Sequence, residues 1–156
     1  QLHARAKGPV AMAKSLIVGS DHAGLSLKRE LCALAATLGY EVVDVGTNSS
    51  DSTDYPDYAH QVASAVARGE GLGLLVCGTG IGMSMAANRH AGVRAALCGD
   101  VFSASMSRQH NDANVLCVGA RVVGPGLASA ILEAFLSHGF EGGRHERRVE
   151  KIEASS

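Results

Sequence analysis

The chain alternates short apolar runs with longer segments in which apolar residues recur at helical spacing. Each run has the length and the aliphatic composition of a buried strand. The predicted strands are residues 15–19, 41–45, 72–77, 93–98 and 114–118. The segments between them predict helices over residues 25–38, 56–68, 83–88, 101–106 and 127–137, with a last helix after Gly143. In the first predicted helix, leucines 27, 31, 34 and 38 form an apolar stripe that can pack on a sheet.

Strands that alternate with helices are typical of parallel βαβ units, which have right-handed crossovers and helices on both faces of the sheet. The apolar runs show little polar alternation, which fits a sheet buried on both sides. We predict an α/β fold, a single doubly wound Rossmann-like domain with a five-stranded parallel sheet and a C-terminal helix. We assign residues 12–156 to this domain. Residues 1–11 lack periodicity and a long apolar core, so we interpret them as an expression remnant or a disordered extension.

The composition narrows the classes of partner. The formal net charge of the 156 residues is −1, which argues against nucleic acid or a membrane surface as a partner. No apolar stretch approaches the roughly 20 residues that a membrane span needs. The four cysteines form no CxxC pair, and no group of side chains has the spacing of metal ligands. We therefore expect reduced thiols, a cytoplasmic location and no metal.

A glycine-rich turn at residues 77–82, with the sequence CGTGIG, follows the third predicted strand and precedes a helix. Such a turn directs backbone N–H groups and the positive end of a helix at one point, which is typical of anion sites. Cys77 would face this point, which favours a reactive thiolate. The alternative is a dinucleotide site with Asp100, about 20 residues further on, as the ribose ligand. The spacing disfavours it, because Met83 stands in the place of the third glycine of the fingerprint.

Other polar residues follow predicted strands and should share an edge of the sheet with Cys77, where ligands bind in such folds. They are Asp21, His22, Thr79, Asp100 and Arg121. Taken alone, the Asp21–His22 pair is explained slightly better as part of a turn, since Asp often caps the start of a helix. Its place at the same edge as Cys77 favours a binding site.

Two further groups lie elsewhere. His110 is in a helix-to-strand connection, at the edge opposite Cys77, so it is either a helix-end residue or part of a partner subunit's site. Arg144 and Arg148 are four residues apart on one face of the last predicted helix. Two guanidinium groups suit a phosphate. The alternative is a solvated tail in which neighbouring glutamates pair with these arginines.

Five motifs in this order resemble those of the type B ribose-5-phosphate isomerases and of their relatives, the galactose-6-phosphate and allose-6-phosphate isomerases. They are GSDHAG at residues 19–24, TDYP at 53–56, CGTGIG at 77–82, SRQHND at 107–112 and EGGRH at 141–145. The resemblance extends from about residue 15 to residue 152. Family members carry cysteine or glutamate as the base, and Cys77 resembles the cysteine kind.

The resemblance implies a cofactor-free aldose–ketose isomerase of the pentose phosphate pathway, which interconverts ribose 5-phosphate and ribulose 5-phosphate. It implies that Cys77 moves a proton between C2 and C1, that Thr79 and the turn stabilise the enediolate, and that His110 opens the sugar ring. The implied substrate contacts are Asp21, His22, Gly78, Gly80, Ile81, Gly82, Asn111, Arg121, Arg144 and Arg148. Family members are dimers or tetramers that share active sites between subunits, so a homodimer or larger homo-oligomer is expected.

Two other functions stay open from the sequence. Within the family, the substrate can be a six-carbon sugar phosphate, such as allose 6-phosphate or galactose 6-phosphate. From a different class, the chain can be a nucleotide-binding module with no chemistry of its own. The second interpretation leaves Cys77, His110 and the arginine pair without a role.

Overall fold

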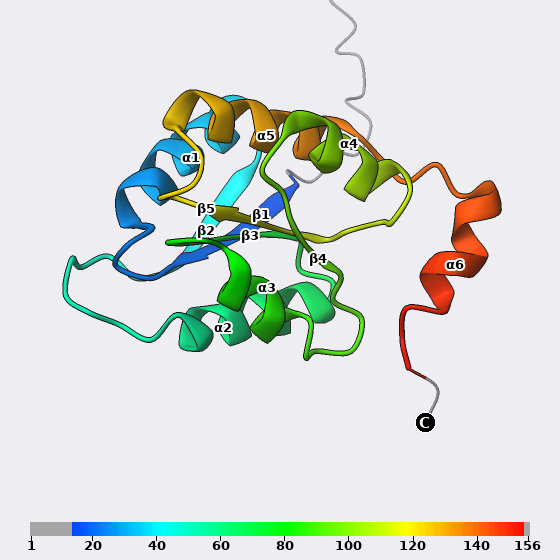
Figure 1. Cartoon of the computed structure of the whole chain (residues 1–156), viewed down its shortest axis with the longest axis horizontal. Helices are drawn as coiled ribbons and strands as arrows, with labels where there is room; N and C mark the ends of the chain where they lie inside the picture. Colours follow the sequence, from blue (N-terminus) through cyan, green and yellow to red (C-terminus); the bar gives the residue numbers. More distant parts are fainter. Residues whose placement is uncertain (1–13, 155–156) are drawn as a thin grey trace, which may run out of the picture.

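Five parallel strands form one sheet in the computed structural model, which describes residues 14–154 (Figure 1). The strands are β1 (Ser15–Ser20), β2 (Glu41–Gly46), β3 (Leu72–Cys77), β4 (Ala95–Leu97) and β5 (Val115–Gly119). Their order is β2-β1-β3-β5-β4, and every neighbouring pair is parallel. The predicted α/β fold with a five-stranded parallel sheet is therefore confirmed. The extension expected at residues 1–11 lies outside the described residues.

Helices cover both faces of the sheet. The helices of the described residues are α1 (Leu25–Thr37), α2 (Tyr55–Ala67), α3 (Ile81–Ala87), α4 (Val101–Gln109), α5 (Pro125–Ser137) and α6 (Glu146–Glu150), with a 3₁₀ turn η1 (Gly143–His145) directly before α6. Figure 1 shows α1, α4 and α5 on one face and α2 and α3 on the other. Among the described residues, none of these helices is long and apolar enough to cross a membrane.

The core divides into two clusters because successive side chains of a strand point to opposite faces. Leu16 and Val18 of β1 pack into the cluster under α1, α4 and α5. Ile17, between them in the sequence, packs into the cluster over α2 and α3, and Cys77 belongs to this second cluster. Because of this alternation, the Cys77 side chain at the end of β3 points to the face of the sheet that α2 and α3 cover.

The two edge strands differ from the sequence prediction. Strand β4 has three residues instead of the predicted six, and its outer side is capped by a side chain. The amide of Asn88 accepts from the Ala95 N–H at 2.7 Å and donates to the Ala95 carbonyl oxygen at 3.0 Å. Strand β2, at the other edge, exposes Glu41, Val43 and Asp44, so burial on both sides holds for the three central strands only.

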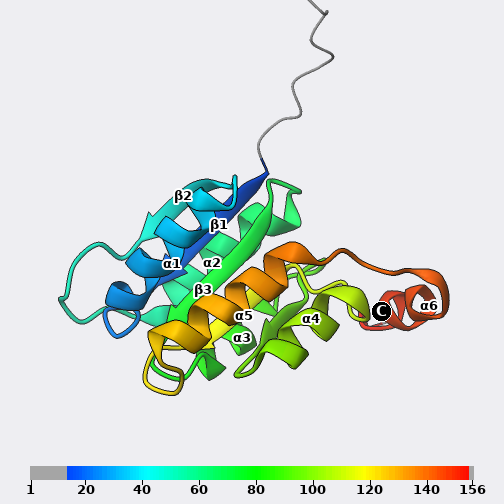
Figure 2. The same cartoon turned by 90° about the horizontal axis from the view of Figure 1, so that it is seen from above.

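The C-terminal segment lies apart from the layers, beyond α4 (Figure 2). The predicted last helix is only five residues long in α6, preceded by η1. Hydrogen bonds near its start and near its end attach this segment to the domain. The Glu141 N–H donates to the Gln109 carbonyl oxygen at 3.0 Å, and the Glu153 carboxylate accepts from the Gly92 N–H at 2.8 Å.

Candidate active site

The glycine-rich turn holds the Cys77 sulfur against backbone donors at the carboxyl end of β3. The Gly80 N–H lies 3.1 Å from Cys77 Sγ, and the side chain is 5% exposed. Gly80 has a φ of +79°, and a Cβ there would lie 2.6 Å from Leu97 Cδ1. Only glycine fits this combination of left-handed backbone and close packing. Helix α3 has just seven residues, so its dipole is short. The Gly80 N–H, in direct contact with the sulfur, is the stronger of the two electrostatic interactions expected at Cys77.

Three predicted residues lie at the same edge as Cys77. The Asp21 carboxylate accepts from the Gly24 N–H at 3.1 Å, which is the turn role that Asp often has, and its side chain is buried. Arg121 donates its backbone N–H to the Gly78 carbonyl oxygen at 2.9 Å, and its guanidinium group lies beside Gly78. His22 follows Asp21 directly. This edge therefore brings together a sulfur, a cation and a histidine around the turn.

His22 is held by a contact that the sequence did not indicate. Its Nδ1 accepts from the Thr53 N–H at 3.2 Å. Because Nδ1 accepts, the proton of the neutral ring is on Nε2, which can then donate to a ligand. Ser20, two residues before His22, and Thr53 itself have buried hydroxyl groups. Neither hydroxyl has a hydrogen-bond partner among residues 14–154. The motifs at residues 19–24 and 53–56 thus meet in space.

The other three cysteines have surroundings that favour the neutral thiol. Burial raises the pKa of Cys32 to about 11, with a further rise from the Asp44 carboxylate. Burial also raises the pKa values of Cys98 and Cys117. All four cysteines are free thiols. These three behave as small apolar residues of the core, as expected from their place in apolar runs.

A second group of candidate residues lines a separate cavity of about 540 Å³. Its lining includes His110, Asn111, Arg144, His145 and Arg148. The rings of His110 and His145 stack with their centroids 4.1 Å apart and an angle of 13° between their planes. Partial burial, followed by the charges of His110 and Arg144, lowers the pKa of His145. The lowered pKa favours the neutral form of His145, which can accept a hydrogen bond.

The two arginines of this cavity are available for an anion. Within residues 14–154, no carboxylate lies within 4.0 Å of either guanidinium group. Glu153, one of the glutamates that could have paired with them, accepts from Gly92 instead. The solvated-tail alternative therefore loses its proposed ion pairs, and within residues 14–154 the two guanidinium charges have no carboxylate partner.

His110, Glu141 and His145 form a group with ligand atoms within 4.8 Å of one another, a spacing that could hold a metal ion. The sequence argument that no residues are suitably grouped for a metal missed it, because His110 lies far from Glu141 and His145 in the sequence and meets them only in the folded chain. Arg144 and Arg148 line the same cavity, and their charges oppose a divalent cation. The charge balance favours an anion in this cavity.

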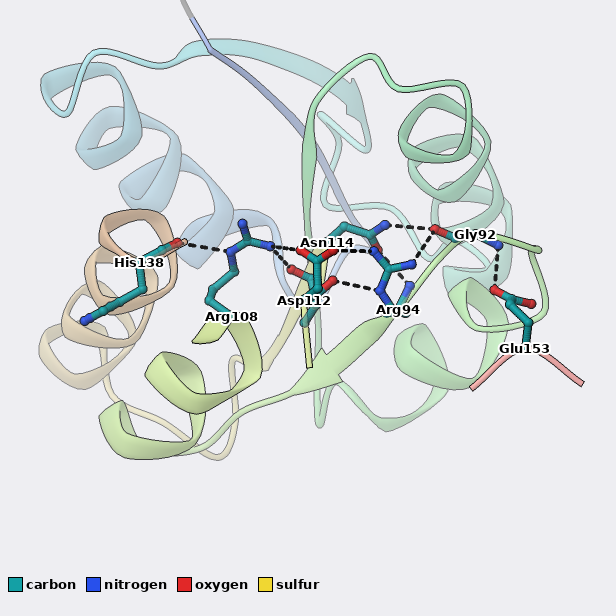
Figure 3. Close-up of polar contacts among 8 residues, drawn as sticks. Gly92, Arg94, Arg108, Asp112, Asn114, His138 and Glu153 are labelled. Atoms are coloured by element: carbon teal, nitrogen blue, oxygen red, sulfur yellow. Dashed lines mark hydrogen bonds and ion pairs between the residues drawn. The ribbon is translucent and has the colours of Figure 1, made fainter. Parts of the chain in front are cut away.

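A polar network fixes the connection that carries His110 (Figure 3). The Asp112 carboxylate accepts from Arg94 at 3.2 Å and from Arg108 at 3.4 Å, and Arg94 Nε donates to the Asp112 carbonyl oxygen at 2.8 Å. Arg108 Nε also donates to the His138 carbonyl oxygen at 3.2 Å. The network ties the end of α4, the segment before β4 and the residue after α5 together, so the connection that carries His110 is held on several sides.

The two groups lie at opposite edges of the sheet within one chain. In the parallel register, Gly73 pairs with Val115 at one end of β3 and β5, and Cys77 pairs with Gly119 at the other. His110 precedes the Val115 end, so the two edges are separated by about 13 Å of strand. This is the opposite placement that the topology of the sequence predicted. Among the candidates, the Cys77 edge collects Asp21, His22, residues 78–82 and Arg121, while Asn111, Arg144 and Arg148 accompany His110.

Two histidines outside the motifs, His60 and His90, form a contact that the sequence did not indicate. His60 Nδ1 and His90 Nε2 are 2.7 Å apart in an exposed pair between α2 and the segment after α3. Their separation of 30 residues in the sequence gave no signal for the contact. The pair lies outside both candidate groups.

Comparisons with known proteins agree with one another over nearly the whole chain. A sequence profile of the family described as ribose/galactose isomerase matches residues 16–152. Ribose-5-phosphate isomerase B of Escherichia coli is 55% identical over 142 residues, which cover 90% of this chain and 95% of that protein.

Solved structures give the same result. Ribose-5-phosphate isomerase B of Clostridium thermocellum has a TM-score of 0.87 at 50% identity, covering 88% of this chain and 94% of that one. Type B ribose 5-phosphate isomerase of Trypanosoma brucei has a TM-score of 0.88 at 46% identity, covering 90% and 97%. On the profile match, the sequence identity and the shared fold, the chain belongs to the ribose/galactose isomerase family.

Proposed function

We propose that this protein is an aldose–ketose isomerase that interconverts ribose 5-phosphate and ribulose 5-phosphate through an enediolate, as a step of the pentose phosphate pathway and without a cofactor. One observation carries the proposal. The chain has two complementary groups, a sulfur with backbone donors and a cationic cavity with a histidine, and together they meet the needs of this reaction. The names of the E. coli, C. thermocellum and T. brucei relatives support the substrate.

The hardest step is removal of the weakly acidic proton from the carbon beside the carbonyl group. Cys77, as a thiolate, takes the proton from C2 and returns it to C1, so the same sulfur is base and then acid. Negative charge develops on the substrate oxygen during this transfer. Backbone N–H groups of residues 78–82 and the Thr79 hydroxyl group stabilise it. The Thr79 oxygen already accepts from the Ile81 N–H at 3.3 Å, which leaves the hydroxyl proton free to donate.

The remaining steps use the other group. His110 moves the proton that opens the sugar ring, and Asn111 positions a hydroxyl group of the substrate. Arg144 and Arg148 bind the phosphate through charge-assisted hydrogen bonds. At the Cys77 edge, Asp21, His22 and Arg121 contact sugar or phosphate oxygens.

A complete site then requires two chains, because about 13 Å of strand separates Cys77 from His110 in one chain. A homodimer is the smallest assembly that joins the two groups, and a tetramer of such dimers is equally compatible. Exposed apolar side chains support a partner at the Cys77 edge. They are Ile81, Leu97, Val101, Phe102 and Val122, and each lies at or just after the carboxyl end of a strand. Phe102 is 73% exposed and Val122 is 67% exposed, an arrangement that a second chain would cover.

A six-carbon sugar phosphate is the alternative substrate, and the name of the matched family, which includes galactose, favours keeping it. The nucleotide-binding module has no such support, because it gives no role to the unpaired arginines. We also propose a cytoplasmic location, which the four free thiols support.

The test is incubation with ribose 5-phosphate in deuterated water, following ribulose 5-phosphate by its absorbance after derivatisation and deuterium by NMR. Proton transfer through a solvent-exchanging base predicts product together with deuterium at the exchanged carbon. Allose 6-phosphate and galactose 6-phosphate serve as parallel substrates. Isomerisation of a six-carbon substrate with a higher kcat/KM would select the alternative, and absence of both isomerisation and exchange would refute the proposal.

A further inference from the structure

Lys28 is buried completely although its side chain ends in a charged ammonium group. It lies on α1, and its exposed fraction is 0%. The ammonium group donates to Asp44 Oδ1 at 2.8 Å and to the carbonyl oxygen of Thr47, and the side-chain amide of Asn48 joins the same cluster. Asp44 and Thr47 thus supply two acceptors to the ammonium group, and the Asn48 amide lies against the same two residues.

Stability alone does not account for a lysine in this place. Burying an ammonium group costs several kcal/mol of desolvation, which an ion pair repays only in part. An unbranched apolar side chain of similar size, such as methionine, would fill most of the space without that cost. What lysine adds is a fixed geometry, since its contacts join α1 to the end of β2 and to the first residues of the following loop.

That loop, residues 47–54, runs from β2 to α2 and projects from the body of the molecule beyond α1 (Figure 1). Near its start, the Thr47 N–H donates to the Ser20 carbonyl oxygen at 2.7 Å. At its end, the Thr53 N–H donates to His22 Nδ1. Directly after it, the Tyr55 ring packs so closely on Gly82 that no Cβ would fit there. The loop therefore connects the Lys28 cluster to the Cys77 edge.

The contact with His22 gives the loop a chemical consequence. While Thr53 donates to Nδ1, the imidazole keeps its proton on Nε2 and presents a donor to a substrate oxygen. If the loop shifts, both tautomers become accessible and the ring can rotate. The orientation of His22 thus depends on a loop whose start is held by a buried charge.

We propose that Lys28 is a positioning residue for the isomerase reaction, because its buried ammonium group fixes loop 47–54 and thereby the tautomer and orientation of His22. This inference rests on the proposed function, since His22 is a substrate contact there. Lys28 itself touches no substrate.

The test compares Lys28→Met with the wild type in two measurements. Steady-state kinetics should show a roughly tenfold to hundredfold lower kcat/KM, mainly through a higher KM, because a small displacement of a binding group is enough for such a loss. Nitrogen-15 NMR of the histidine rings, with His22 assigned from His22→Gln, should show His22 as the Nε2–H tautomer in the wild type and as a mixture in the variant. Asp44→Asn, which removes the charge that holds the ammonium group, should shift both measurements in the same direction.

Leu31→Val is the matched control, since Leu31 is also fully buried on α1 but faces the apolar cluster. It should lower the melting temperature and leave KM and the His22 signals unchanged. Wild-type KM and wild-type His22 signals in Lys28→Met would overturn the proposal, as would an equal rise of KM in Leu31→Val at the same melting temperature. If Lys28→Met does not fold, Asp44→Asn decides by the same criteria. If the wild type has no isomerase activity, the proposed function fails, while the His22 signals still decide whether Lys28 fixes the ring.

Discussion

The four cysteines show how the surroundings of a side chain, and not its identity, decide what it can do. Cys32, Cys98 and Cys117 have raised pKa values, caused mainly by burial. Cys77 is also buried, but a backbone N–H lies 3.1 Å from its sulfur, in a turn at the edge of the sheet. This N–H belongs to Gly80, whose left-handed backbone turns its own amide back toward the end of β3.

Arg144 provides a prediction at the scale of a single residue. In Arg144→Ala, KM for ribose 5-phosphate should rise about tenfold or more, because a charge-assisted hydrogen bond to phosphate contributes roughly 1.5–3 kcal/mol. Binding of unphosphorylated ribose should change little. Steady-state kinetics measures KM for ribose 5-phosphate, and ribose and inorganic phosphate are compared as competing ligands in the same assay.

Arg147→Ala is the control for this substitution. Arg147 is exposed on the same short helix but does not line the cavity of His110. It should keep the wild-type KM for ribose 5-phosphate. Equal losses of phosphorylated and unphosphorylated ligands in Arg144→Ala, or the same loss in Arg147→Ala, would return this segment to a solvated charged tail.

At the scale of elements, the junction between β3 and α3 should tolerate no side chain at Gly80. In Gly80→Ala, the left-handed φ of +79° costs about 1–2 kcal/mol, and the new Cβ would meet Leu97 Cδ1 at 2.6 Å. We expect the free energy of unfolding in urea to fall by at least that amount, with loss of isomerase activity because the Gly80 N–H leaves Cys77 Sγ.

Gly99→Ala tests whether the effect belongs to the turn. Gly99 follows β4, its φ lies outside the left-handed region, and a Cβ there would meet nothing within 4 Å. Its free energy of unfolding should stay close to that of the wild type, since the new Cβ meets no neighbouring atom of the chain. A Gly80→Ala variant as stable and active as Gly99→Ala would show that the turn does not need glycine.

Local patterns along the chain were enough to predict the strands and the edge of the sheet at which Cys77 lies. The apolar runs ending at residues 19 and 77 are followed by polar or glycine-rich turns, and parallel strands bring such turns to one edge. The same reasoning put His110 at the opposite edge. These features depend on residues close in sequence and on a topology that allows few arrangements.

Features that depend on partners far away in the sequence could not be predicted. Strand β4 pairs with β5 over three residues only, and the Asn88 amide binds the outer backbone groups of Ala95. Lys28 interrupts the apolar stripe of α1, but only the fold reveals Asp44 and Thr47 as its partners. The stacking of His145 on His110 likewise arises from tertiary packing, although both belong to recognised motifs.

At the scale of the whole molecule, the opposed positions of Cys77 and His110 make a prediction about mixtures. Cys77→Ala and His110→Ala should each abolish turnover. After the two inactive proteins exchange subunits, mixed dimers should each contain one intact site. Random exchange puts about half of the chains in mixed dimers, so about a quarter of the wild-type activity should return.

Subunit exchange needs its own measurement, and native mass spectrometry of differently tagged chains provides it. The double variant Cys77→Ala/His110→Ala, mixed with the wild type, is the control. Its mixed dimers contain no intact site, because each shared site lacks either Cys77 or His110. No recovery of activity between the two single variants, despite verified exchange, would show that each site is built within one chain.

The division of the two groups between opposite edges also bears on how the rate responds to the amount of protein. If a site exists only where two chains meet, an isolated chain is folded but inert. Below the dissociation constant of the dimer, the concentration of sites follows the square of the chain concentration, so halving the protein removes about three quarters of the activity. Dilution would then abolish the activity without unfolding the chains, and concentrating the protein would restore it.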